Sequence, residues 1–456
     1  MMLDDDRSPG RGATVEAELK GLVRGRVHAS GDDGYEQART VWNGSVDHHP
    51  AAVVHCADAE DVRAALATAR RCGVPVSVRG GGCDWAGRAI REGGVVLDLS
   101  AMRGVRIDPG TSVAEIDGGV LAGELLDAAA AHGLATAAGA VRSVGMTGMA
   151  LAGGYGGLIG RFGLTLDNLL SADLVLADGS RVVAGPDDET DLWWALRGGG
   201  GNFGVVTSAR FRLHPLGLVI GGIVMYPAEQ APQVLRGYQE IIAAAPDELT
   251  VMAGFLTGPG GLPIVFVAPT WSGDLDTGQV AVDPLTKLGT PVMSALQPMP
   301  YPELLHMFDA GSAPGNGNAL NTRWLPALTE DAITALTEAA LTRTSPRSLL
   351  MVHHFHGAAT RVSSDATAFA VRRPHLLTEI IAVWAPGEEA DQHRSWIADV
   401  SASLAPGALP GGYPNILDPA NIERTRLGFG GNLERLLAVK RRYDPDHVFS
   451  AVAALH

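Results

Sequence analysis

Three glycine-rich segments in the first half of the chain could bind an anionic ligand. The first, residues 80–82, directly follows the apolar residues 75–78, and the others cover residues 145–157 and 198–204. Glycine allows close approach to the backbone, and consecutive N–H groups can form a concave site for a phosphate. One such run alone would more simply be a turn. Three runs on one domain favour a large flat cofactor that carries a diphosphate.

The first glycine run does not match the common nucleotide-binding motifs. A Rossmann site needs a helix directly after its glycines, so that the helix N-terminus meets the diphosphate. Residues 83–94 lack helical periodicity and lead into a short apolar strand at residues 95–99. The GxxxxGK(S/T) motif is also absent from the sequence. The site expected here is therefore of a different kind.

Histidines in the second half of the chain could contact a substrate or move a proton. On an expected strand over residues 350–357, alternation places His354 and His356 on one face and His353 on the other. His354 and His356 are candidate substrate contacts or general bases, or else sheet histidines without a catalytic role. A metal site would need further ligands, and no clustered carboxylate or cysteine supplies them, so no metal is expected.

The elements that would position these residues indicate an α+β protein. A strand at residues 53–56, a helix between Asp58 and Gly73, and a strand at residues 75–78 form a βαβ unit. Short strands with turn signals follow, so the first domain mixes parallel and antiparallel pairing. Longer strands at residues 217–226, 249–256, 264–271, 350–357 and 378–385 then alternate with helices near residues 229–245, 329–342 and 388–404. This pattern predicts an antiparallel sheet with helices on one face.

The chain divides into four expected parts. Residues 1–15 are polar and contain glycine and proline, which predicts disorder. Residues 16–215 form the cofactor-binding domain and residues 216–405 the substrate-binding domain. Residues 406–456 regain the composition of the first domain and are expected to return to it.

Composition limits the classes of partner. The 456-residue chain has a formal net charge of −15, whereas nucleic-acid binding needs a basic surface, so no nucleic-acid partner is expected. The longest apolar run, residues 216–225, is too short to span a bilayer, so no membrane association is expected. The three cysteines form no CxxC pair and no secretory signal is recognisable, which predicts a cytoplasmic protein. The oligomeric state is left open.

Several further motifs follow one another along residues 42–449. They are Val78-Arg79-Gly80-Gly81-Gly82, Val144-Gly145-xx-Gly148 with Arg161-xx-Gly163-Leu164-xx-Asp167-Asn168, Asp191-Leu192-Trp193-Trp194-Ala195-Leu196-Arg197 before GGGGNFGVVT, Thr367-Ala368-Phe369 with Arg372, Tyr413-x-Asn415, and Gly431-Asn432-xx-Arg435-Leu436 with Tyr443-Asp444-Pro445. Each motif is weak alone, but their order and spacing are specific. The sequence resembles the FAD-linked oxidases of the vanillyl-alcohol oxidase/p-cresol methylhydroxylase (PCMH) fold, in the berberine-bridge-enzyme-like branch.

The resemblance implies a two-part PCMH-type domain that binds FAD. The loop after residue 78 would wrap the diphosphate, residues 141–157 and 204–206 would line the isoalloxazine, and the tail would bring Tyr413 and Asn415 to the flavin. Tyr413 would be either a base beside the flavin or a hydrogen-bonding partner of the cofactor. The cofactor-binding residues expected on this basis are Val78, Arg79, Gly80, Gly81, Gly82, Cys83, Asp84, Val141, Val144, Gly145, Gly148, Gly153, Gly154, Gly156, Gly204, Val205, Val206, Tyr413 and Asn415. The candidate catalytic residues are Tyr413, His354 and His356.

The sequence departs from the family at two positions that bear on flavin attachment. Many members tether FAD through a histidine after the Arg-x-Gly-Gly loop, and this chain has Cys83 there. Many also use a cysteine three residues before the Val-Gly pair, and this chain has Val141, which cannot form that link. FAD is therefore expected to be bound non-covalently, and a link through Cys83 stays open.

The resemblance favours an oxidase that removes a hydride from a C–H bond next to oxygen or nitrogen of a small organic substrate, a secondary metabolite, with O₂ as the acceptor. Val144 matches the position of a small gate residue over the flavin, where leucine is associated with poor oxygen reactivity. Two alternatives stay open because the tethers are missing. One is a redox-neutral cyclase or isomerase, and the other is a flavin-bound protein that sequesters a small molecule.

Overall fold

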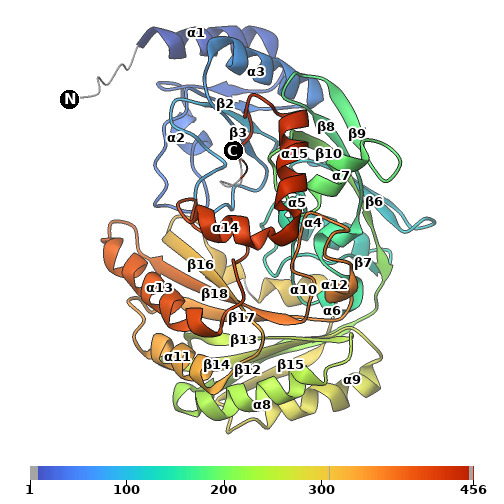
Figure 1. Ribbon diagram of the computed structural model, residues 1–456, viewed down its shortest axis with the longest axis vertical. Helices are drawn as coiled ribbons and strands as arrows, with labels where there is room; N and C mark the ends of the chain where they lie inside the picture. Colours follow the sequence, from blue (N-terminus) through green and yellow to red (C-terminus); the bar gives the residue numbers. More distant parts are fainter. Residues whose placement is uncertain (1–8, 308, 451–454, 456) are drawn as a thin grey trace.

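The protein has the expected α+β architecture, built from four sheets (Figure 1). The computed structural model describes residues 9–307, 309–450 and 455. A four-stranded, a five-stranded and a two-stranded sheet lie in the first half of the chain, and a seven-stranded sheet lies in the second. Among the described residues, no helix has the length and apolar character needed to cross a bilayer.

The four-stranded sheet carries the first glycine loop at the end of one strand. Its order is β1 (Val27–His28), β2 (Ala52–His55), β4 (Val95–Asp98) and β3 (Val76–Arg79), with β2 and β3 parallel to β4. Helix α3 (Ala59–Cys72) connects β2 to β3. Asp58 caps this helix by accepting the N–H groups of Glu60 and Asp61, and Gly73 ends it with a φ of 65°. The predicted βαβ unit is confirmed.

The N-terminal segment corrects one expectation. Helix α1 (Pro9–Leu22) begins inside the segment expected to be disordered, so residues 9–15 are helical, whereas residues 1–8 lie outside the described residues. Val15 and Leu19 are fully buried in the same core as Val62 and Leu66 of α3. Burial of these two side chains explains why a segment of polar composition folds. The short helix α2 (Tyr35–Ala38) follows.

The five-stranded sheet is antiparallel, and the third glycine segment leads into one of its strands. Its order is β5 (Val105–Asp108), β6 (Val113–Asp117), β10 (Val205–Arg212), β8 (Leu169–Val175) and β9 (Arg181–Ala184). The glycine run at residues 198–204 leads directly into the central strand β10. The remaining elements of this part are α4 (Ala122–Ala130), α5 (Met146–Ala152), α6 (Ile159–Phe162), the 3₁₀ helix η1 (Thr165–Asn168), α7 (Thr190–Leu196), and the paired short strands β7 (Leu134–Ala135) and β11 (His214–Pro215).

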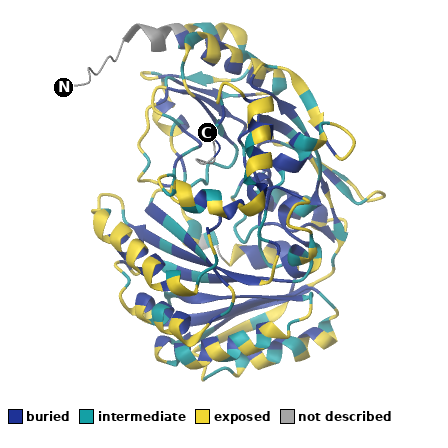
Figure 2. Cartoon of the chain, viewed as in Figure 1, coloured by how far each residue is buried: buried dark blue, intermediate teal, exposed yellow. Residues whose placement is uncertain are grey.

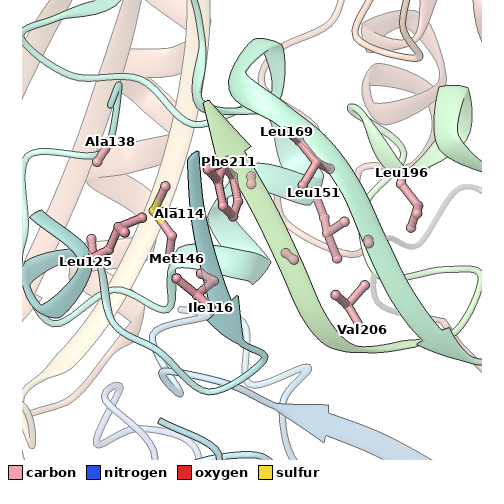
Figure 3. Close-up of a cluster of buried hydrophobic side chains, with 14 of the residues drawn as sticks. Ala114, Ile116, Leu125, Ala138, Met146, Leu151, Leu169, Leu196, Val206 and Phe211 are labelled. Atoms are coloured by element: carbon pink, nitrogen blue, oxygen red, sulfur yellow. The ribbon is translucent and has the colours of Figure 1, made fainter. Parts of the chain in front are cut away.

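A buried cluster fixes the glycine segment around α5 (Figure 3). Met146, at the start of α5, is fully buried beside Leu125 of α4 and Ile116 of β6, and Leu151 near its end is buried in the same cluster. Both ends of α5 are therefore anchored by apolar burial, at roughly 1.5–3 kcal/mol for each large side chain. This anchoring sets the positions of Gly145 and Gly153, which flank the helix.

The seven-stranded sheet is antiparallel throughout. Its order is β15 (Met293–Met299), β12 (Val219–Pro227), β14 (Pro263–Trp271), β13 (Leu249–Thr257), β17 (Leu349–Phe355), β18 (His375–Trp384) and β16 (Gly317–Leu325). Helices α8 (Ala231–Ala243), α9 (Leu275–Val282), α11 (Glu330–Leu341) and α13 (Asp391–Leu404) cover one face, with their outer sides exposed (Figure 2). The predicted helix-covered sheet is confirmed, although β15 and β16 were not among the expected strands. Short helices α10 (Tyr301–His306) and α12 (Ala358–Arg361) contact α4 and α6 of the first half.

The tail returns to the first half of the chain. After the 3₁₀ helix η6 (Ala405–Gly407) it forms α14 (Ile422–Gly428), η7 (Gly430–Asn432) and α15 (Leu433–Tyr443). In α15 the buried Lys440 donates to Asn202 O at 2.7 Å and pairs with the fully buried Asp444 at 2.6 Å. A buried ammonium needs such partners, and they tie α15 to the third glycine run.

Candidate functional site

The loop after β3 offers unpaired backbone donors. The N–H groups of residues 80–83 make no hydrogen bond to another residue within the described part of the chain. The carbonyl of Gly82, by contrast, accepts the N–H of Trp42 at 3.1 Å. Consecutive unpaired donors form a site for an anion, as a diphosphate requires. The side chain of Arg79 lies elsewhere, because it is buried against Asp98 at 2.6 Å and Ala38 O at 2.6 Å.

The first two glycine segments touch backbone to backbone. A Cβ on Gly81 would lie 2.4 Å from Gly145 N, and one on Gly145 would lie 2.6 Å from Gly81 N. Any side chain at either position would separate the segments, so only glycine fits here. The contact places the end of the anion-binding loop next to the start of α5, where the resemblance puts the flavin.

Cys83 lies at the same junction. Its Sγ is 3.4 Å from Gly81 O and 3.4 Å from Ser143 O, and burial raises the pKa of the thiol to about 11. A thiol with a raised pKa stays protonated at neutral pH, and the thiolate is the reactive form. Val141 and Val144 flank Ser143 and are half-buried. Cys83 therefore stands at one position where the resemblance places an attachment residue and lies close to the segment that carries the other, Val141, with its thiol protonated.

The segment after Cys83 is tied to the tail. Asp84 pairs with Arg88 at 2.7 Å, and Arg88 donates to Asn415 O at 2.6 Å. The indole of Trp85 donates to Ile416 O at 2.8 Å. Asp84 thus holds Arg88, and Arg88 holds the backbone of Asn415. These contacts bring the Tyr413–Asn415 motif to the two glycine segments.

Tyr413 is buried against the second glycine segment. Its hydroxyl accepts the N–H of Gly154 at 2.8 Å, and a Cβ on Gly153 would lie 2.2 Å from the same oxygen. Burial raises the pKa of the Tyr413 phenol above its ordinary value. The Gly154 N–H and the charge of Arg372 favour the phenolate, but burial outweighs them, so the structure gives Tyr413 an anchoring contact and a protonated hydroxyl.

A cavity lies between the second glycine segment and the uncovered face of the seven-stranded sheet. Its lining includes Tyr155, Gly157, Thr250, Thr270 and His353, together with Ala140, Gly156, Met252, Leu304 and Leu305. A Cβ on Gly157 would lie 2.4 Å from Thr270 Oγ1, so the segment packs directly on the sheet. The free space is about 40 Å³. We call it the substrate cavity.

Three polar side chains form a connected group at this cavity. The Tyr155 hydroxyl donates to Glu379 Oε1 at 2.5 Å, and His353 Nε2 lies 2.8 Å from Glu379 Oε2. The rings of Tyr155 and His353 meet edge to face with centroids 4.8 Å apart. Burial alone would raise the pKa of the Glu379 carboxyl. The interactions with His353 and with the Tyr155 hydroxyl are stronger than this effect, so the pKa of Glu379 is lowered. We call these residues the Tyr155–Glu379–His353 group.

The sequence analysis did not single out this group. His353 was placed correctly on the opposite face from His354 and His356, but was not proposed for a role. The sequence does mark out the other two residues. Tyr155 is the only aromatic residue within residues 145–157. Glu379 is the only acidic residue in the apolar strand β18.

His354 and His356 lie at the end of β17, away from Tyr413. Their rings stack at 3.8 Å, and His356 Nε2 is 3.1 Å from Thr250 Oγ1. Burial lowers the pKa of His356 to about 4 and that of His354 to about 2. Within the described residues no group of three metal-ligating side chains is present.

The third glycine segment contacts α5 and the tail rather than the cavity. The N–H groups of Gly198 and Gly200 both donate to Leu151 O, and a Cβ on Gly204 would lie 2.9 Å from Val175 O. Val205 and Val206 are buried in two different hydrophobic clusters. Val78 packs at the edge of one of these clusters, and Gly148 is exposed with open space around it.

Comparison with known proteins decides the family. Residues 50–185 match the FAD binding domain family and residues 412–454 match the berberine and berberine-like family. The (R)-6-hydroxynicotine oxidase of Paenarthrobacter nicotinovorans is 30% identical, over 94% of this chain and 95% of the relative. The chain is an FAD-linked oxidoreductase of the berberine-bridge-enzyme-like family. The expected family, enzyme class and cofactor are confirmed.

Solved structures of relatives share the fold of this FAD-linked oxidoreductase. The 6-hydroxy-D-nicotine oxidase of Arthrobacter nicotinovorans superposes with a TM-score of 0.88 at 26% identity, covering 95% of this chain and 98% of that one. The glucooligosaccharide oxidase of Acremonium strictum has a TM-score of 0.84 at 26% identity, covering 97% and 99%. Its FAD is a 6-S-cysteinyl, 8α-N1-histidyl form.

The residues of this FAD-linked oxidoreductase fit FAD without that double link. The unpaired donors of residues 80–83 suit the diphosphate, and residues 80–82 carry no side chains that would block its approach. Cys83 and Val141 stand at the positions where the resemblance places the two attachment residues. The loop therefore suits the diphosphate of FAD.

Proposed function

We propose that the protein is an oxidase that removes a hydride from a C–H bond next to oxygen or nitrogen of a small organic substrate, with O₂ as the final acceptor. The observation that carries the proposal is the Tyr155–Glu379–His353 group at a cavity beside the flavin-binding glycine segment. Oxidation of an alcohol or amine carbon needs a hydride acceptor on one side and a base for the O–H or N–H proton on the other. FAD supplies the hydride acceptor when it is bound.

His353 is the proposed base. In the tautomer with its proton on Nε2, His353 donates to Glu379, and Nδ1 is an acceptor for a substrate proton. Glu379 would hold the ring in this tautomer and stabilise the imidazolium that forms. Tyr155 donates to the other carboxylate oxygen and so fixes Glu379. This arrangement differs from the assignment of Tyr413, His354 and His356 made from the sequence.

The cavity supports a small substrate. Its polar lining includes Thr250, Thr270, Tyr155 and His353, and its apolar lining includes Met252, Leu304 and Leu305. The free space of about 40 Å³ favours a small substrate. The names of relatives, hydroxynicotine oxidase and glucooligosaccharide oxidase, suggest cyclic amines and sugars as the first compounds to test.

Anaerobic mixing of the FAD-loaded protein with a panel of cyclic amines, secondary alcohols and oligosaccharides tests the proposal. Bleaching of the flavin absorbance followed by recovery in air, with one H₂O₂ formed per substrate, is the expected result. Turnover without bleaching would instead support a cyclase or isomerase, and tight binding without turnover would support sequestration. A His353→Gln variant should bind the same compound but reduce the flavin about 10²–10⁴-fold more slowly.

A further inference from the structure

A second cavity lies beside the substrate cavity, at the end of β17. Its lining includes His354, His356, Asp247, Arg361 and Leu376, and it holds about 460 Å³ of free space. None of its lining residues belongs to the glycine segments that bind FAD. The second cavity is therefore separate from the proposed flavin site.

Two stacked histidines stand between the cavities. His354 lines both of them, and the His356 ring stacks on it with the two planes within 3°. His356 lines the second cavity and hydrogen-bonds Thr250, which lines the substrate cavity, at 3.1 Å. The Thr250–His356 hydrogen bond thus joins the two spaces through the wall that separates them.

We propose that Thr250 and His356 form a proton path between the substrate cavity and the second cavity. This inference rests on the proposed oxidase function. In that reaction the substrate O–H or N–H proton is released inside the substrate cavity, and one proton is taken up again when O₂ becomes H₂O₂. Each proton needs a polar route between this cavity and bulk water. The cavity has about 40 Å³ of free space, enough for only a few water molecules, and the Thr250–His356 hydrogen bond offers a polar link out of it.

The chemistry of the link suits proton transfer. The Thr250 hydroxyl gives its proton to His356 Nε2 while its oxygen takes one from a water in the substrate cavity, to which His353 has passed the substrate proton. His356 then releases the proton of Nδ1 to water in the second cavity, so neither residue keeps a net charge. A neutral imidazole is required for the first step, and burial lowers the pKa of His356 to about 4. Proton uptake runs through the same groups in reverse.

The surroundings of His356 keep it neutral. Asp247 faces it and favours its charged form, but Arg361, which pairs with Asp247 at 2.9 Å, opposes this effect. His354 adds a second neutral ring, and its buried Nδ1 has no hydrogen-bond partner among the described residues. Two histidines without a third ligand do not make a metal site, and the described residues contain no suitable cluster. Proton transfer therefore explains the pair better than metal binding.

The test uses the FAD-loaded enzyme and needs no knowledge of the substrate. Light-reduced enzyme is mixed with O₂ in weak buffer, and flavin reoxidation and proton uptake from a pH indicator are recorded together. In the parent enzyme the two signals should have the same rate. In the Thr250→Val and His356→Gln variants, proton uptake should lag reoxidation by at least tenfold, and free imidazole should restore it in a His356→Ala variant.

Thr360→Val is the matched control, because Thr360 borders the second cavity but bonds only Gly357 O. It should keep the two rates equal. Equal rates in Thr250→Val and His356→Gln would overturn the path, whether or not an oxidisable substrate is found. Failure of every substrate to reduce the flavin would instead overturn the proposed oxidase function. Absence of a lag when a small ligand fills the second cavity of the parent enzyme would also contradict the path, since blocking the exit must slow proton transfer.

Discussion

Glu379 on β18 lies 2.8 Å from His353 on the neighbouring strand β17, and both side chains are buried. The other oxygen of Glu379 accepts the hydroxyl of Tyr155 from the glycine segment. One carboxylate therefore links the seven-stranded sheet to the segment expected to line the flavin. Glu379 therefore orients both the Tyr155 ring and the His353 ring.

Glu379→Gln should slow flavin reduction about 10²–10³-fold while FAD stays bound. The amide keeps the size of the side chain but cannot compensate a positive charge on His353. Stopped-flow reduction of the FAD-saturated variant measures the effect. Glu388→Gln, which changes an exposed carboxylate near the end of β18, is the control and should match the parent. A rate for Glu379→Gln within threefold of the parent would exclude the proposed role of this carboxylate.

FAD should leave the protein on acid precipitation. The Cys83 thiol, with its pKa raised to about 11 by burial, is almost entirely protonated at neutral pH, and Val141 cannot attach the flavin. Purified protein is precipitated with acid, and the colour of pellet and supernatant is compared. A yellow pellet with flavin mass on the Cys83 peptide would show that a cysteinyl link forms. Cys83→His should permit attachment, since the loop around it is otherwise that of the family.

Val144→Leu should slow reoxidation of the reduced enzyme by O₂ about tenfold or more. Val144 is half-buried next to Gly145, where the resemblance places a gate residue over the flavin. A longer side chain would restrict access of O₂ to the reduced ring. The reoxidation rate is followed by flavin absorbance, with Val141→Leu as the neighbouring control. Equal rates in Val144→Leu and the parent would place the oxygen path elsewhere.

The sequence was most informative where local chemistry decides the structure. Asp58 and Gly73 mark the ends of α3 because capping is a local hydrogen-bonding effect, and the strands from residue 217 onward were found from their apolar runs. Strand β15 was missed because most of its side chains are exposed, so it lacks an apolar pattern. Helix α1 was missed because its polar segment folds by packing on α3.

The site was less predictable than the fold. The glycine segments could be found because runs of glycine are visible in the sequence itself. In the Tyr155–Glu379–His353 group, by contrast, Tyr155 and His353 are more than 190 positions apart in the sequence. No local pattern encodes such a contact. His354 and His356 attracted attention by their spacing, but strand alternation turns them away from His353, and only the structure shows which face meets the glycine segment.

Acid should destabilise the protein between about pH 6.5 and pH 4. Burial lowers the pKa values of His356 and His375 to about 4, below the unfolded value of about 6.5. In this range the unfolded chain binds more protons than the folded one, so the free energy of unfolding falls as the pH falls. Each histidine contributes up to about 3 kcal/mol. Urea unfolding at pH 4.5 and pH 7.5 measures the difference.

His375→Asn should reduce that acid sensitivity by about 2 kcal/mol, because the variant lacks one of the groups that must be protonated on unfolding. The exposed His132→Asn is the control and should leave the difference between the two pH values unchanged. The same pH dependence in His375→Asn and the parent would show that other groups govern the acid transition.

Tyr413→Phe should weaken the flavin site more than it slows the chemistry. The hydroxyl accepts the buried N–H of Gly154, and an unpaired buried N–H costs about 1–3 kcal/mol, so the free energy of unfolding should fall by that amount and FAD should bind less tightly. The raised pKa of the phenol, due first to burial, disfavours a tyrosinate base. The reduction rate of the FAD-saturated variant should therefore stay within tenfold of the parent.

Tyr226→Phe, which removes another buried hydroxyl far from the glycine segments, should affect stability alone. A loss of 10²–10⁴-fold in the reduction rate at unchanged stability would instead establish Tyr413 as the base that the family resemblance suggests.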